Sequence, residues 1–255
     1  MTNILKNPEH GQLRVLIIFG SLAIYGRERG TFRIAKALKD SGVSIHFIIS
    51  NDWGVLVEEE FKNDGFSYSA MHFGTQVDRD IFWYPENIIF SLKAILFSPA
   101  AIIKKISEFR PTHILLGNWL EFIYAFPALF FLKTTIIYRL GDSIPAGLYG
   151  FIFRRLIVPR VKMFICVSEY IRNNALLNSI PKEKLTLIYS LFPVIPEQVY
   201  PYNFIYRKNK RQAIVTYVGQ ISKHKGVDLF VQAAIDYVSQ SPDITFYLAG
   251  EYIRE

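Results

Sequence analysis

Short apolar runs alternate with longer amphipathic segments along most of this chain. The apolar runs predict buried strands at 14–19, 43–49, 112–116, 135–138, 163–167 and 185–189. Helical periodicity predicts helices at 31–40, 88–97, 100–109, 119–131, 147–156 and 168–177, with Pro99 separating the second from the third. Strands that alternate with helices form βαβ units, so we expect an α/β fold: a doubly wound parallel sheet of Rossmann-like type over residues 1–191.

The alternation is interrupted after residue 191. Residues 192–212 contain Pro193, Pro196 and Pro201 together with a run of basic residues, which predicts an interdomain linker. A further strand, helix and strand follow at 215–218, 227–238 and 244–248. We therefore expect residues 213–255 to form the first part of a second Rossmann-like domain.

Composition narrows the classes of partner and compartment. The 255 residues are 51% hydrophobic and 20% charged, as in a folded globular protein, and the net charge of +7 favours anionic partners. No motif interleaves aromatic and basic residues, so nucleic acid is not an expected partner. Cys166 is the single cysteine, which fits a reducing compartment. No apolar stretch is long enough for a signal peptide or a span, so we expect a cytoplasmic protein, or one peripheral at the inner face of the membrane.

One segment carries a pattern seen at membrane surfaces. In residues 93–110, Lys93, Lys104, Lys105 and Arg110 flank apolar side chains. A basic amphipathic helix of this kind can lie on an anionic bilayer. The same pattern also fits a helix that packs on the core and exposes a solvated basic face, and both interpretations stay open.

The loop between the predicted strand at 215–218 and the helix at 227–238 is a candidate anion site. It contains Gly219, Lys223, Lys225 and Gly226. A loop that leaves a strand and starts a helix presents free N–H groups and the positive helix end, and lysines add charge suited to phosphate. An ordinary βα unit with a solvated basic loop is the alternative.

This segment resembles the start of the second domain of the group 1 glycosyltransferases, retaining enzymes with two Rossmann-like domains (the GT-B fold). Their pattern is a strand, Gly-Arg, a few residues, Lys-Gly and a helix. Gly219 and Lys225 match, and Gln220 stands in the place of the arginine. The resemblance implies that Gly219, Gln220 and Lys225 bind the diphosphate of a nucleotide-sugar donor.

Two earlier stretches extend the resemblance. GSLAIYGRERG is similar to the family's Gly-Gly-x-Glu-Arg, which implies that Gly26, Glu28 and Arg29 approach the donor phosphates and the acceptor. The alternative is that the glycines only relieve crowding at a helix start. TTIIYRLGDS places Asp142 at the family's acidic catalytic position and Gly141 where a histidine usually precedes it. An Asx-turn role for Asp142 is the alternative.

The resemblance implies transfer of a sugar from a nucleotide-sugar donor to a carbohydrate or lipid-linked acceptor, in envelope or exopolysaccharide synthesis, without a metal or another cofactor. The histidines and the single cysteine show no metal-ligand spacing. The family's Glu-x7-Glu element would lie beyond Glu255, so we expect an incomplete donor domain. The alternative function is a catalytically inactive, glycosyltransferase-like module that binds a glycan, a membrane or a partner protein.

Overall fold

The computed structural model describes residues 12–20, 26–50, 61–62, 64–71, 85–131, 134–144, 146–190, 213–240 and 244–250. The chain divides into two compact units, residues 1–193 and 194–255, and each is described by itself. The linker predicted at 192–212 lies outside the described residues.

Unit 1 is built on a parallel sheet in the order β3-β2-β1-β4-β5-β6-β7. Its described strands are β1 (Arg14–Phe19), β2 (Ser44–Ser50), β3 (Ser67–Met71), β4 (His113–Leu116), β5 (Thr135–Leu140), β6 (Met163–Cys166) and β7 (Leu185–Leu187). Its described helices are α1 (Gly26–Asp40), α3 (Pro85–Phe109), α4 (Trp119–Phe131), α5 (Gly147–Ile152), α6 (Val158–Arg160) and α7 (Glu169–Leu177). The predicted doubly wound, Rossmann-like sheet is confirmed.

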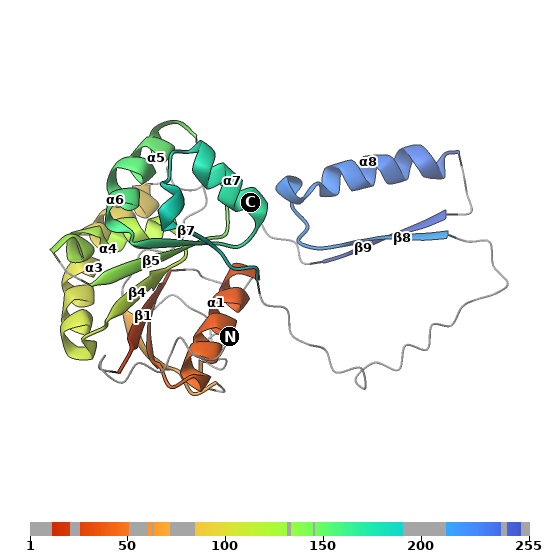
Figure 1. The fold of residues 1–255 in the computed structure, drawn as a ribbon. Coiled ribbons are helices and arrows are strands. Elements are labelled where there is room, and N and C mark those ends of the chain that lie inside the picture. The colour runs from red at the N-terminus through yellow and green to blue at the C-terminus, as the bar shows by residue number, and fades with distance from the viewer. Residues whose placement is uncertain are drawn as a thin grey trace. The chain divides into compact units, whose positions relative to one another are not determined.

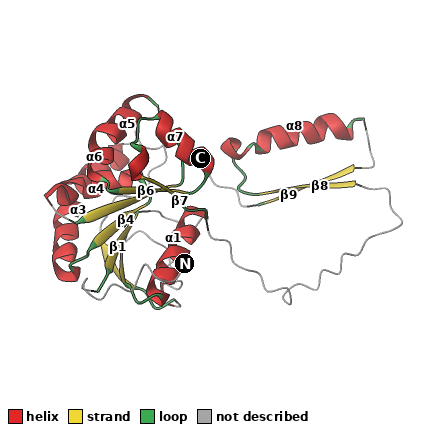
Figure 2. Cartoon of the chain, viewed as in Figure 1, coloured by secondary structure: helices red, strands yellow, loops and turns green. Residues whose placement is uncertain are grey.

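Helices cover both faces of this sheet, so the strands can be continuous apolar runs. In Figures 1 and 2, α3, α4, α5 and α6 lie on one side and α1 on the other. Alternate residues of β1 point to the two sides: Leu16 and Ile18 join the core under α3 and α4, whereas Ile17 and Phe19 join the core under α1. This two-sided burial is characteristic of parallel sheets.

Helix α1, strand β3 and helix α3 differ from the sequence prediction. Helix α1 begins at Gly26 rather than near residue 31, and strand β3, with the polar sequence SYSAM, was not predicted. β3 is an edge strand that pairs only with β2 in the sheet, so it carries little of the apolar signal of a buried strand. Helix α3 runs through Pro99, and we infer that its packing against the core and α4 outweighs the hydrogen bond that a proline removes.

The segment predicted as one helix at 147–156 is also more complex. Helix α5 passes into a π-helical stretch, Phe153–Ile157, before α6. Such stretches are rare and often occur at functional sites. Here the π-helical stretch carries Phe153, which lines a pocket described below.

Unit 2 is a small α/β unit. Strands β8 (Ala213–Val218) and β9 (Ile244–Ala249) are parallel, and α8 (Val227–Val238) connects them through a preceding 3₁₀ turn, Lys223–Lys225. Rings of Tyr217, Phe230 and Phe246 pack between helix and strands. Among its described residues only Ser222 is buried, because two strands and one helix cannot enclose a larger core.

Candidate functional site

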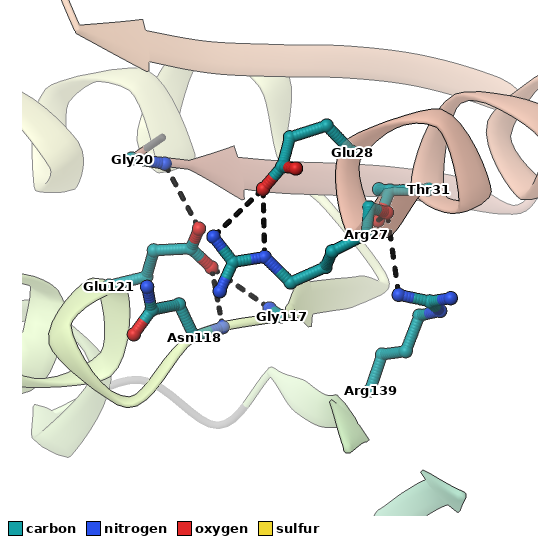
Figure 3. A network of polar contacts seen from close by, with 8 residues as sticks. All are labelled: Gly20, Arg27, Glu28, Thr31, Gly117, Asn118, Glu121 and Arg139. Carbon is teal, nitrogen blue, oxygen red and sulfur yellow. Dashed lines mark hydrogen bonds and ion pairs between the residues drawn. The ribbon is translucent and has the colours of Figure 1, made fainter. Parts of the chain in front are cut away.

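The strand order of unit 1 reverses between β1 and β4, and we call this place the switch point. Doubly wound sheets bind ligands there, at the carboxyl ends of their strands. In this structure the carboxylate of Glu121 occupies that point (Figure 3). It accepts hydrogen bonds from the backbone N–H of Gly20 (3.0 Å), Gly117 (2.9 Å) and Asn118 (3.0 Å). Glu121 therefore joins the end of β1 to the end of β4.

The local sequence explains why Glu121 points this way. Asn118 precedes the first residue of α4, and Glu121 is the third residue of that helix. An Asn followed three residues later by Glu is a capping-box spacing, in which the carboxylate returns to the backbone N–H of the cap residue. The bond from Asn118 N–H to Glu121 is the one that this motif requires. The same carboxylate then reaches Gly20 across the sheet.

Arg27 and Glu28 of α1 extend the network. The Arg27 guanidinium contacts the Glu28 carboxylate through Nε and Nη2, both at 2.8 Å (Figure 3). Burial acts to lower the pKa of Arg27, but Glu28 and Glu121 outweigh it and raise the pKa. Burial raises the pKa of the Glu121 carboxyl above its usual range, against the opposing effects of Arg27 and the three amides. The carboxylate thus carries a burial penalty that its partners offset only in part.

Arg139 of β5 contacts the first turn of α1. It is buried, and its guanidinium donates to the Arg27 carbonyl (3.4 Å) and the Ser190 hydroxyl (3.2 Å). Burial and the nearby Arg27 charge lower the pKa of Arg139. A Cβ at Gly30 would lie 2.6 Å from Arg139 Nη2, so only glycine allows this close contact without a shift.

A small pocket lies beside this network, at the carboxyl ends of β4 and β5. Its volume is about 50 Å³. It is lined by Gly117, Asn118, Trp119, Tyr138, Leu140, Gly141, Asp142, Ser143, Ile144 and Phe153. Asp142 is exposed, and Tyr138 is buried, with a pKa that burial raises. The pocket combines aromatic walls with hydroxyl, amide and carboxylate groups, and its volume, well below the about 300–1,000 Å³ of whole-ligand sites, suits a single hydroxyl-bearing group.

The predicted site residues of unit 1 lie in two different places. Asp142 lines the pocket. Gly26, Glu28 and Arg29 lie in the first turns of α1 rather than in a loop; Gly26 and Arg29 are exposed, and Glu28 is buried against Arg27. The alternative that the glycines relieve crowding fits Gly30 but not Gly26, where a Cβ would meet nothing within 4 Å.

Sequence reasoning missed Glu121, Asn118 and Arg139. The Asn-x-x-Glu spacing directly after a predicted strand was a usable signal for the first two. Arg139 gave no comparable signal, because an arginine inside an apolar run identifies neither its partners nor its depth.

In unit 2, the predicted donor residues follow β8. Gly219 N–H donates to the Ala249 carbonyl (3.0 Å), and the Gln220 carbonyl accepts from the Tyr217 hydroxyl (2.8 Å). Lys225 is exposed at the end of the 3₁₀ turn. Thus Gly219, Gln220 and Lys225 share one loop at the carboxyl end of β8.

Two glycines shape this loop. Gly226 has φ +76°, a left-handed conformation that favours glycine, and it caps α8 without a side-chain hydrogen bond. A Cβ at Gly250 would overlap the carbonyl oxygen of Gly219, so the backbones after β8 and β9 approach as closely as glycines allow. The first turn of α8 therefore presents amide groups that no side chain of its cap residue occupies.

The described part of the chain holds no group of three or more His, Cys, Asp or Glu side chains suited to a metal ion. Within those same ranges, every helix is too short or too polar to cross a bilayer.

Comparisons with known proteins agree with the fold. A glycosyltransferase from Rickettsia africae aligns with a TM-score of 0.63 and 15% identity over 95% of this chain and 69% of that chain. HepE from Anabaena, in complex with UDP-glucose, aligns with a TM-score of 0.67 and 14% identity over 93% of this chain and 60% of that chain. The lipopolysaccharide outer core galactosyltransferase WaaB aligns with a TM-score of 0.59 and 12% identity over 94% of this chain and 69% of that chain.

The chain thus spans 60–69% of the length of these three structures. At such identities the likeness concerns the fold. No curated protein sequence matches the chain significantly. The family model described as Glycosyltransferase Family 4 matches residues 24–191, which include all residues of the pocket and of the Glu121 network except Gly20. The chain belongs to Glycosyltransferase Family 4.

Proposed function

We propose that this protein transfers a sugar from a nucleotide-sugar donor to a carbohydrate or lipid-linked acceptor, in envelope or exopolysaccharide synthesis. The observation that carries the proposal is the pocket at the ends of β4 and β5, which lies wholly within the residues that match the glycosyltransferase family. The Anabaena structure, which shares the fold, contains UDP-glucose, and this supports a nucleotide-sugar as the donor.

In this proposal unit 1 binds the acceptor. Its switch point is filled by the Glu121 carboxylate, which repels a phosphate and already uses the amides of Gly20, Gly117 and Asn118. The small neighbouring pocket therefore takes one uncharged, hydroxyl-bearing group at the edge of the acceptor. Asp142 contacts the acceptor there, and Gly26 and Arg29, both exposed at the start of α1, contact the rest of it. Glu28 acts through Arg27, because it is buried against that guanidinium.

Unit 2 binds the donor. The loop that begins at Gly219 holds the diphosphate at the carboxyl end of β8, through the Gln220 side chain and the Lys225 ammonium. Positive charge and backbone amides at a helix start stabilise the negative charge that develops on a departing diphosphate. Lys225 and the amide groups of the first turn of α8 supply this stabilisation in the proposal, beside the exposed Asp228 of the same turn.

The test is UDP binding measured by isothermal titration calorimetry, with Lys225→Ala as the variant. Loss of one phosphate-contacting lysine is expected to weaken binding roughly tenfold or more, as for a charge-assisted hydrogen bond of about 1.5–3 kcal/mol. Lys182→Ala, an exposed lysine of unit 1, is the matched control and should bind UDP as the wild type does. Wild-type protein that binds no UDP, or equal affinity in Lys225→Ala, would contradict the donor assignment.

A second candidate function is glycan binding without transfer. Gly141 favours it, because this pocket residue offers no side chain where the family usually has a histidine. A Cβ at Gly141 would come no closer than 4.0 Å to Arg139 Nη1, so crowding does not impose the glycine. Release of UDP from UDP-glucose in the presence of glycan acceptors separates the two functions: release that Asp142→Asn abolishes supports transfer, and glycan binding without release supports the second candidate.

A further inference from the structure

Helix α3 has a second apolar face that nothing in the described structure covers. Ile89, Leu92 and Leu96 are 52%, 54% and 71% exposed, and Ile103 is 41% exposed. Their spacing of three, four and seven residues places them on one side of the helix. We call this stripe, with the adjoining Phe97, Lys93 and Lys104, the outer face of α3.

An adjoining side of α3, about 90° around the helix axis from the stripe, already makes the core contacts of the helix. Ile102 and Ile106 are buried in the cluster that also contains residues of α4 and β1. The outer apolar residues are therefore additional to those that the fold requires. The sequence left open a core-facing helix with a solvated basic face, but the exposed side is itself apolar.

The outer face also carries positive charge. Lys93 and Lys104 are exposed on it, beside the apolar stripe, and Phe97 lies next to them at 66% exposed. Among the described side chains of α3 the acid is Glu108, near the end of the helix, and Lys105 pairs with it at 2.7 Å. The net charge that this face presents is thus positive.

We propose that the outer face of α3 docks on an anionic lipid bilayer, with the helix in the plane of the interface. Leucine and isoleucine enter the boundary between headgroups and acyl chains, and the lysines contact the anionic headgroups. An in-plane orientation follows from the fold, because the side of α3 that carries Ile102 and Ile106 is committed along its length to the core.

A second copy of the chain fits this face less well. In a twofold-symmetric pair, Lys93 and Lys104 of one protomer would face the same lysines of the other, and like charges across an interface are unfavourable. A bilayer with anionic lipids satisfies both the apolar and the basic components. The inference goes beyond the proposed transfer reaction and does not depend on it, because docking requires neither donor nor acceptor.

The experiment is co-sedimentation of the full chain with vesicles of phosphatidylcholine alone and of phosphatidylcholine with 30% phosphatidylglycerol, a composition chosen as about one anionic lipid in three. The variant is Leu92→Glu with Leu96→Glu. Both positions are largely exposed, so the substitutions leave the core intact. Leu177→Glu on α7, where the leucine is 85% exposed, is the matched control. Circular dichroism verifies that each variant is folded.

We expect the wild type and Leu177→Glu to bind the anionic vesicles, and the double variant to bind at least about tenfold more weakly. Lys93→Ala should weaken binding about fivefold, as expected for one basic residue near an anionic surface, and added salt should weaken it further. Equal binding of the double variant and the wild type would overturn the proposal. So would a dimer in solution that Leu96→Glu dissociates, since that result assigns the face to a second copy. Neither result bears on UDP binding, which tests the transfer reaction separately.

Discussion

Replacing Glu121 by glutamine probes the switch point of unit 1 with almost no change in volume. One carboxylate oxygen accepts from Gly20 N–H, and the other accepts from both Gly117 and Asn118 N–H. A glutamine has one acceptor oxygen. If that oxygen stays at Gly117 and Asn118, the amide NH₂ faces the buried N–H of Gly20, and two donors then oppose each other.

The magnitude follows from two opposing contributions. A buried donor left without an acceptor destabilises a protein by about 1–3 kcal/mol, and the attraction between Glu121 and Arg27 is lost as well. Neutralising the side chain also removes part of its burial penalty, which is the reason that the pKa of this carboxyl is raised. We expect the hydrogen-bond loss to dominate, so Glu121→Gln should lower the free energy of unfolding by about 1–3 kcal/mol.

Urea unfolding followed by tryptophan fluorescence measures this loss in the right part of the chain. All three tryptophans belong to the segment 53–119, so the signal reports on unit 1. The matched control is Glu169→Gln, which removes an exposed ion pair with Arg172 and should change stability by less than about 1 kcal/mol. A Glu121→Gln protein as stable as the wild type would refute the reasoning, because the burial penalty would then equal or exceed the hydrogen-bond gain.

Three further predictions concern backbone proximity and pH. Gly250→Ala forces a Cβ into the carbonyl oxygen of Gly219, so far-UV circular dichroism should lose strand and helix signal while the tryptophan-detected transition of unit 1 is unchanged; a full signal would contradict this. Gly30→Ala displaces the flexible end of the Arg139 side chain and disturbs its hydrogen bonds, while alanine gains about 0.5–1 kcal/mol over glycine within the helix, so the unfolding free energy in the same urea assay should fall by no more than about 1 kcal/mol; a larger loss would show that the guanidinium cannot relocate. Burial, with a neighbouring lysine, lowers the pKa of His46 below 6.5, so the folded state binds fewer protons than the unfolded state and stability falls as pH drops below about 6.5. Urea midpoints at pH 7.0 and below should show this fall, and a His46→Asn variant with an undiminished fall would assign it to other groups.

The sequence predicts most of the parallel sheet because β1, β2, β4, β5 and β6 are apolar runs of the kind that burial on both faces requires. It does not predict β3, because all but one of its side chains are at least partly exposed. It also divides α3 at Pro99, because the local preference of proline carries no information about the tertiary packing that keeps the helix continuous.

The candidate site likewise contains residues that the sequence predicts and residues that it does not. Asp142 is predictable because it follows a buried strand, where doubly wound sheets bind ligands. The geometry around Glu121 is not, because it depends on which strands become neighbours: Gly20 and Glu121 are 101 positions apart in the chain. The depth of Arg27 and Arg139 is likewise a property of packing rather than of local pattern.

The shallow packing of unit 2 has a dynamic consequence. Ser222 is its single buried residue among those described, whereas β1 and β2 of unit 1 are almost wholly enclosed. Amide hydrogens in β8 and β9 can therefore exchange with solvent through small local openings, while those in β1 require disruption of a large region. In hydrogen–deuterium exchange, the strands β8 and β9 that flank the Lys225 loop should therefore exchange their amide hydrogens rapidly. A ligand bound at this loop would slow exchange across both strands.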